Sequence, residues 1–153
     1  MSKDVVLWIH VAAGVLAWVL GAIALWLSVN HRQARDGLTA FHWSVLAVAI
    51  TASVLVAFKP EDLWWLWLLA VFSYGLALVG HLAPRERSPG WLRLGIHGQG
   101  GACIALTTAT FVVSVDGLAQ IAAWVVPTLV GVPLLELWYR RENAAWQLQG
   151  AAA

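Results

Sequence analysis

The stretch that decides the fold runs from Tyr74 to Gly101 and reads YGLALVGHLAPRERSPGWLRLGIHGQGG. Two apolar segments are joined there by a short polar connection. Proline disfavours a helix interior but suits a helix start, so Pro84 is expected to end one helix and Pro89 to begin the next. His81 and His97 lie just inside the two apolar segments. An ionisable side chain in a membrane segment is costly, and it marks a candidate functional site.

The composition assigns the whole chain to a membrane. Of its 153 residues, 61% are hydrophobic and only 11% are charged, whereas a soluble domain carries roughly 25% charged residues. Its 11 tryptophans suit the two membrane interfaces, where amphipathic Trp collects. No basic tract indicates a nucleic-acid partner. We therefore predict one integral membrane domain, residues 1–153, whose first partner is the lipid bilayer.

Five apolar runs are long enough to cross ~30 Å of hydrocarbon at ~1.5 Å per residue. They predict an all-α bundle of five transmembrane helices at about 5–28, 39–58, 63–82, 91–114 and 119–139. The tail from Arg140 onward is predicted to fray. On the first helix, a stripe of small residues for close helix packing is expected on one face, at Gly14, Ala17 and Gly21, in line with His10.

The distribution of Lys and Arg predicts the orientation. With five helices, one side of the membrane receives Arg32, Arg35, Arg85, Arg87, Arg93, Arg140 and Arg141, and the other receives only Lys3 and Lys59. Because cytoplasmic loops carry the excess of Lys and Arg, we expect the amino terminus outside and the carboxyl terminus in the cytoplasm. The predicted location is the cytoplasmic membrane, with multiple passes.

This topology sorts the ionisable residues by depth. His42, His81, His97 and Glu136 are all expected near the cytoplasmic interface, whereas His10 lies about two turns in from the opposite side. The sequence therefore predicts an inner cluster of three imidazoles and one carboxylate.

The leading hypothesis for this cluster is haem b in an electron-transfer protein. A b-type haem in a helical bundle needs two axial imidazoles and small residues where the porphyrin lies flat. His97, surrounded by glycines, would be one ligand, and His81 or His42 the other. Arginines of the connection would pair with the propionates, namely Arg85, Arg87 and Arg93. A bundle this small would need other membrane subunits or a quinone as redox partner.

Three alternatives stay open. A transition metal could be bound by the nitrogen and oxygen ligands His42, His81, His97 and Glu136. A membrane-embedded enzyme could use Glu136 as a catalytic residue, exchanging protons with a histidine on a lipophilic substrate. Finally, the histidines could be interfacial and bonded to water, in a non-enzymatic membrane subunit or partner-binding protein.

Short motifs resemble a bacterial family of small multi-helix membrane proteins known as a domain of unknown function. They are the runs at 10–14, 31–32, 91–93 and 97–101, with Gly21 and the two prolines of the fifth helix, Pro127 and Pro133. The chain departs from that pattern after His31, because the next glycine is Gly37 rather than one within about four residues. The resemblance implies a topology and no activity. The histidines near helix ends are also similar in architecture to membrane b-type cytochromes.

Overall fold

The computed structural model describes residues 2–29, 35–83 and 88–151, and the regular structure within them is α-helical. Its five helices are α1 (Lys3–Val29), α2 (Arg35–Phe58), α3 (Pro60–Leu82), α4 (Pro89–Ser114) and α5 (Leu118–Ala151). Each contains a segment long and apolar enough to cross a membrane. The predicted all-α chain with five candidate spans is confirmed, and the side that each terminus faces stays a prediction.

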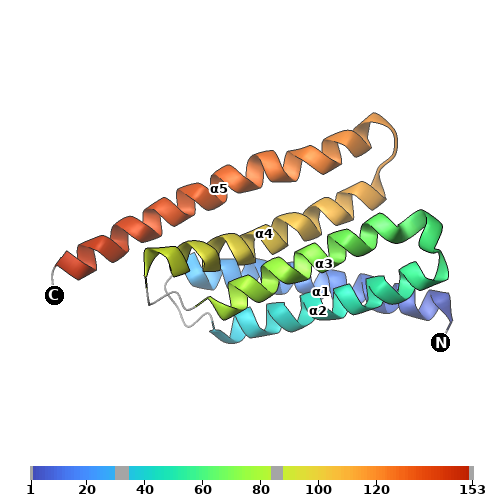
Figure 1. Cartoon of the computed structure of the whole chain (residues 1–153), viewed down its shortest axis with the longest axis horizontal. Coiled ribbons are helices and arrows are strands. Elements are labelled where there is room, and N and C mark those ends of the chain that lie inside the picture. The colour runs from blue at the N-terminus through green and yellow to red at the C-terminus, as the bar shows by residue number, and fades with distance from the viewer. Residues whose placement is uncertain (1, 30–34, 84–87, 152–153) are drawn as a thin grey trace.

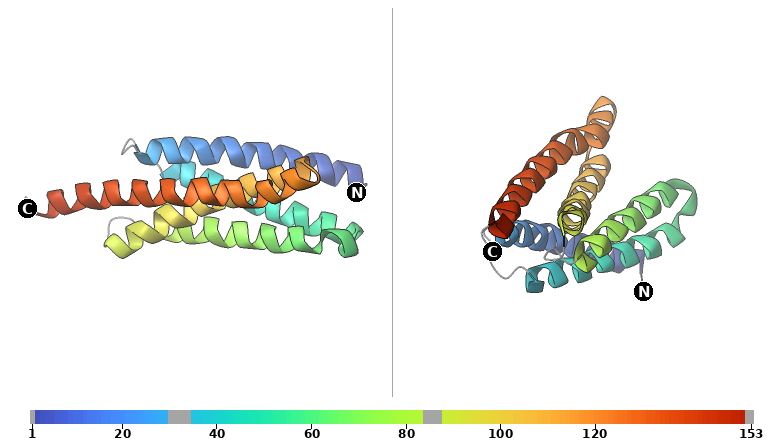
Figure 2. Two further views of the ribbon diagram at one scale, coloured as in Figure 1. Left: turned by 90° about the horizontal axis from the view of Figure 1, so that it is seen from above. Right: turned by 60° about the vertical axis from the view of Figure 1, so that its left-hand side comes forward.

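Helices α1 to α4 form a bundle, and α5 lies against its outside (Figure 1). Neighbours along the chain pack side by side, and α1 also touches α4, which closes the ring of four. Among the described residues, the α5 backbone comes close only to that of α4. A side-chain contact also joins α5 to α3, because the Trp124 ring of α5 lies 5.5 Å from the Trp65 ring of α3. The two further views show α5 inclined across the bundle, so it is an added helix rather than a member of the ring (Figure 2).

Proline and serine set the starts of α3 and α4. Pro60 occupies the first turn of α3, directly after Lys59, so this helix begins earlier than the predicted residue 63. At α4, Pro89 has the same role, and the Ser88 hydroxyl accepts a hydrogen bond from the Trp91 N–H at 3.4 Å. A proline at the first helical position lacks only an N–H that would have no partner there. Both prolines therefore start helices whose predicted first residues were about 63 and 91.

Helix α5 departs most from its predicted length. It continues through Pro127 and Pro133 to Ala151, instead of ending near 139, so the predicted frayed tail from Arg140 is helical. The added residues are mostly Arg, Glu, Ala, Gln and Leu, which favour helix. Its 34 residues span about 50 Å at ~1.5 Å each, longer than the hydrocarbon layer. The last turns extend beyond the other helices (Figure 1).

The core of the four-helix ring lies between all four helices, α1 to α4. Phe41 is 2% exposed and packs with Val45 and Val48 of α2. It also faces Gly21 of α1, where an added Cβ would lie 3.0 Å from the Phe41 ring and 2.9 Å from the sulfur of Cys103. The predicted small-residue stripe is thus used for packing at Gly21, although Gly14 has open space around it.

Helices α3 and α4 touch backbone to backbone at Gly80 and Gly98. A Cβ on Gly98 would lie 2.5 Å from the Gly80 nitrogen and 2.9 Å from the Leu76 carbonyl oxygen. Only glycine permits so close an approach. The glycines beside His81 and His97 therefore serve helix contact at this point.

Candidate functional site

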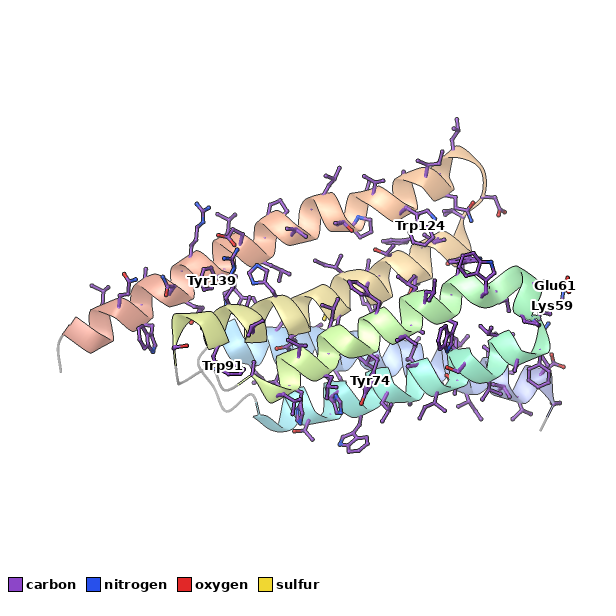
Figure 3. All side chains as sticks on the ribbon, viewed as in Figure 1. Lys59, Glu61, Tyr74, Trp91, Trp124 and Tyr139 are labelled. Atoms are coloured by element: carbon purple, nitrogen blue, oxygen red, sulfur yellow. The ribbon has the colours of Figure 1, made fainter. Side chains whose placement is uncertain are left out.

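The predicted site residues lie toward one end of the bundle, where α3 ends, α4 begins and α5 extends outward. We call this the basic end, because Arg93, Arg140 and Arg141 are found there. In Figure 3, Trp91 and Tyr139 mark the basic end, and Lys59 and Glu61 mark the opposite end. Arg85 and Arg87, the other predicted propionate partners, lie outside the described residues.

His42 of α2 and His81 of α3 form one of two pairs. Their rings stack with centroids 4.7 Å apart and planes inclined by 14°. Tyr74 of α3 lies 5.5 Å from the His42 ring, and Trp43 meets that ring edge-on at 5.4 Å. His42 is 7% exposed, and its Nδ1 is buried with no hydrogen-bond partner among the described residues. The pair thus combines a tight ring stack with one unsatisfied polar atom.

This stacking does not suit a shared metal ion. The lone pair of an imidazole nitrogen lies in the ring plane, and two nearly parallel planes do not direct their lone pairs at one ion. Two axial haem ligands would have to lie on opposite faces of a porphyrin, for which directly stacked rings leave no room. The His42–His81 pair would need to separate before it could bind either group.

His97 of α4 and Glu136 of α5 form the second pair. His97 Nε2 lies 3.6 Å from Glu136 Oε2, and Arg93 approaches the same oxygen at 3.7 Å. The other oxygen, Oε1, accepts a hydrogen bond of 3.0 Å from the Arg140 Nε. Tyr139 completes the group, with its ring 6.1 Å from that of His97 and 5.5 Å from the Arg93 guanidinium carbon. One carboxylate is therefore shared by two guanidinium groups and an imidazole.

The backbone fixes the orientation of His97. Its Nδ1 lies 3.0 Å from the carbonyl oxygen of Arg93, one turn earlier in α4. A carbonyl oxygen can only accept, so Nδ1 carries the hydrogen, and Nε2 is left facing Glu136. The side chains of His97 and Glu136 are 32% and 31% exposed, so the pair can be reached from outside the bundle.

The structure thus divides the predicted cluster into two pairs. His81 follows Gly80 and His97 precedes Gly98, at the point where the two backbones touch. From there, His81 faces α2 and His97 faces α5. In the described ranges, no group of three or more His, Cys, Asp or Glu residues could hold a metal ion. Haem b and a transition metal stay predictions, for which this arrangement offers no converging ligands.

Other polar side chains of the helices form local hydrogen bonds. His10 Nδ1 is hydrogen-bonded to the Thr51 hydroxyl of α2 at 2.9 Å, toward the opposite end. Thr107, Thr108 and Thr110 donate to carbonyls of their own helix, as sequence spacing allows. His31 lies outside the described residues.

Sequence reasoning missed two members of the Glu136 group. Arg140 was considered only for topology, and Tyr139 was not considered. The available signal was the spacing of four residues between Glu136 and Arg140, and between Arg93 and His97, because such residues are neighbours on a helix surface.

Replacing His42 with phenylalanine should maintain or raise stability. The ring stack would remain, while the buried Nδ1, which has no partner among the described residues, would be removed. An unsatisfied buried polar atom costs about 1–3 kcal/mol. Thermal unfolding in detergent, followed by size-exclusion chromatography, would measure the change, with His81→Phe as the control because His81 is less buried. A marked loss of stability in His42→Phe alone would show that Nδ1 has a partner that the helices do not supply.

Comparison of the chain with protein-family models, with curated proteins and with solved structures finds no match.

Proposed function

We propose that this protein is a membrane-embedded acid–base protein, in which His97 and Glu136 exchange a proton with a lipophilic molecule arriving from the bilayer. The observation that carries this proposal is the direction of the His97 ring. Nδ1 is held by a backbone carbonyl, and Nε2 faces Glu136 Oε2 at 3.6 Å.

The pair can hold one proton in two places. With the proton on Nε2, it is an imidazolium and a carboxylate; with the proton on Oε2, it is a neutral imidazole and a carboxylic acid. The total charge of the pair is zero in both states, so a proton transfer between the two residues leaves that total unchanged. Proton transfer takes place at ~2.6–3.2 Å, and such contacts are often longer before a substrate binds. A small movement of either side chain would close the gap from 3.6 Å.

The depth of Glu136 supports a site on the membrane side of the interface. It lies about 18 residues after Leu118, which is roughly 27 Å along a helix in a hydrocarbon layer of ~30 Å. A carboxylate there needs partners, and Arg93, His97 and Arg140 provide them. A molecule dissolved in the bilayer could reach the pair without leaving the membrane.

The rival interpretation is a fixed ion network in a non-enzymatic membrane subunit. Arg93 of α4 also ties Glu136 of α5 to the neighbouring helix, while Arg140 pairs with Glu136 within α5, and surface ion pairs of this kind occur without any chemistry. The two interpretations differ in one state: proton exchange requires a population of neutral Glu136, whereas a fixed network does not.

Dicyclohexylcarbodiimide tests this difference, because it is lipophilic and reacts only with a protonated carboxyl group. We expect weak labelling of Glu136 in wild-type membranes at neutral pH, located by peptide mass spectrometry, because its cationic neighbours favour the carboxylate. Arg93→Gln should increase the labelling several-fold, because it removes a cation that favours the carboxylate. Glu136→Gln is the negative control, and Glu61, at the opposite end, gives the background for an exposed carboxylate. If Glu136 is not labelled in the folded wild type or in folded Arg93→Gln, the result would support the fixed network instead.

A further inference from the structure

A groove lined almost entirely by apolar side chains runs along the seam between α4 and α5, with one residue of α1 at its edge. Its volume is about 420 Å³, within the range of ~300–1,000 Å³ typical of ligand sites. The α5 wall includes Val126, Val130 and Leu134, and the edge residue of α1 is Leu25. The one hydroxyl in the lining, that of Thr107, already donates to the Cys103 carbonyl. Neither His97 nor Glu136 lines this groove, so it is separate from the proposed acid–base site.

The length and depth of the groove match one leaflet of a bilayer. Along α5 it extends from Val126 to Leu135, roughly 13 Å at ~1.5 Å per residue. Half of a ~30 Å hydrocarbon layer is about 15 Å. Val126 lies roughly 12 Å along the helix from Leu118, so the groove falls mainly in the half of the membrane next to the basic end.

A cation continues the same face of α5 toward the basic end. Arg141 comes seven residues after Leu134, which returns to the same side of a helix after two turns. It lies about 35 Å along the helix from Leu118, beyond the hydrocarbon and at the level of the headgroups. Arg141 is exposed and forms no ion pair with any described residue, whereas its neighbour Arg140 is paired with Glu136. The groove is therefore followed by an uncompensated positive charge.

From this arrangement we infer that α4 and α5 bind an anionic phospholipid, with one acyl chain in the groove and the phosphate at Arg141. The match between the length of the groove and one leaflet favours an acyl chain as its occupant, and the charge of Arg141 favours an anionic headgroup. A guanidinium also pairs well with phosphate oxygens. Leu137, which is 63% exposed, provides apolar surface between the groove and the cation. The site goes beyond the proposed acid–base function and does not depend on it.

Native mass spectrometry of the full chain in detergent tests the site. The protein is titrated with an equimolar mixture of phosphatidylglycerol and phosphatidylcholine with identical chains, and the bound lipids are counted. We expect the wild type to prefer phosphatidylglycerol, and Arg141→Gln to reduce that preference about five-fold. Arg141→Lys keeps the charge and should retain most of the preference.

The binding of the acyl chain and the binding of the headgroup are tested separately. Val130→Trp places a large ring in the groove and should lower the retention of both lipids. Val132→Trp is the matched control, because Val132 is similarly exposed but does not line the groove. Both valines are exposed, so each variant should keep the circular dichroism spectrum and elution volume of the wild type. If binding requires the acyl chain in the groove, millimolar inorganic phosphate should displace no bound lipid.

Three results would overturn the inference. In the first, Arg141→Gln binds phosphatidylglycerol as selectively as the wild type does. In the second, Val130→Trp retains both lipids unchanged, so the groove holds no chain. In the third, free phosphate competes with the lipid, which makes Arg141 a simple anion site.

Discussion

Gly98→Ala should lower the unfolding temperature by roughly 5–10 °C, because the added methyl group has no room between α3 and α4. The new Cβ would lie 2.5 Å from the Gly80 nitrogen and 2.8 Å from its Cα, and these backbone atoms cannot move aside alone. Overpacking of a closed contact costs about 1–3 kcal/mol, occasionally more. In a protein of this size, 1 kcal/mol corresponds to ~2–4 °C. Thermal unfolding of the detergent-solubilised protein measures the shift.

Gly75→Ala is the matched control for this substitution. Gly75 is also in a helix interior, on α3, but nothing lies within 4 Å of the Cβ that it would gain. Alanine favours helix over glycine by about 0.5–1 kcal/mol, so this variant should be unchanged or slightly more stable. If both variants behaved alike, the contact between Gly80 and Gly98 would not hold α3 against α4.

Phe41→Ala should cost about 3–5 kcal/mol, because it empties the centre of the four-helix ring. The Phe41 ring is 2% exposed and fills the space that Gly21 of α1 leaves open. Thermal or denaturant unfolding in the same detergent would measure the loss.

Phe72→Ala makes the same deletion on the lipid-facing side of α3, where the ring is 60% exposed. Detergent or lipid contacts both the ring and its replacement there, so the expected loss is small. Equal losses at Phe41 and Phe72 would contradict the placement of the core between the four helices α1 to α4.

Hydrophobic length was enough to predict the five helices, because each crossing needs a long apolar run, and such a run has few alternatives in a membrane. Helix ends were harder to predict. The predicted third helix begins at about residue 63 although Pro60 suits a helix start, and the predicted frayed tail from Arg140 is helical. In both places the local preference of the residues for helix outweighed the change from apolar to polar sequence.

The candidate site was predicted in depth but not in direction. Counting residues from the helix ends placed His42, His81, His97 and Glu136 toward the same end of the bundle, and the structure agrees. Which of them meet depends on rotation about each helix axis, and one residue turns the direction by about 100°. That rotation is set by packing between distant segments, such as the glycine contact of α3 with α4. The depth of a residue in the membrane can therefore be counted from one sequence, whereas the direction in which its side chain points requires the packed structure.

The position of α5 outside the ring has a consequence for biogenesis. Helices of a membrane protein can insert first and associate afterwards, and α5 is the last to leave the ribosome. Because its backbone comes close only to that of α4 among the described residues, the ring of α1 to α4 can close before α5 arrives. Glu136 then reaches His97 only when α5 docks. The contact between His97 and Glu136 would therefore form after the ring has closed, and a chain halted before α5 docks would carry an intact bundle without its acid–base site.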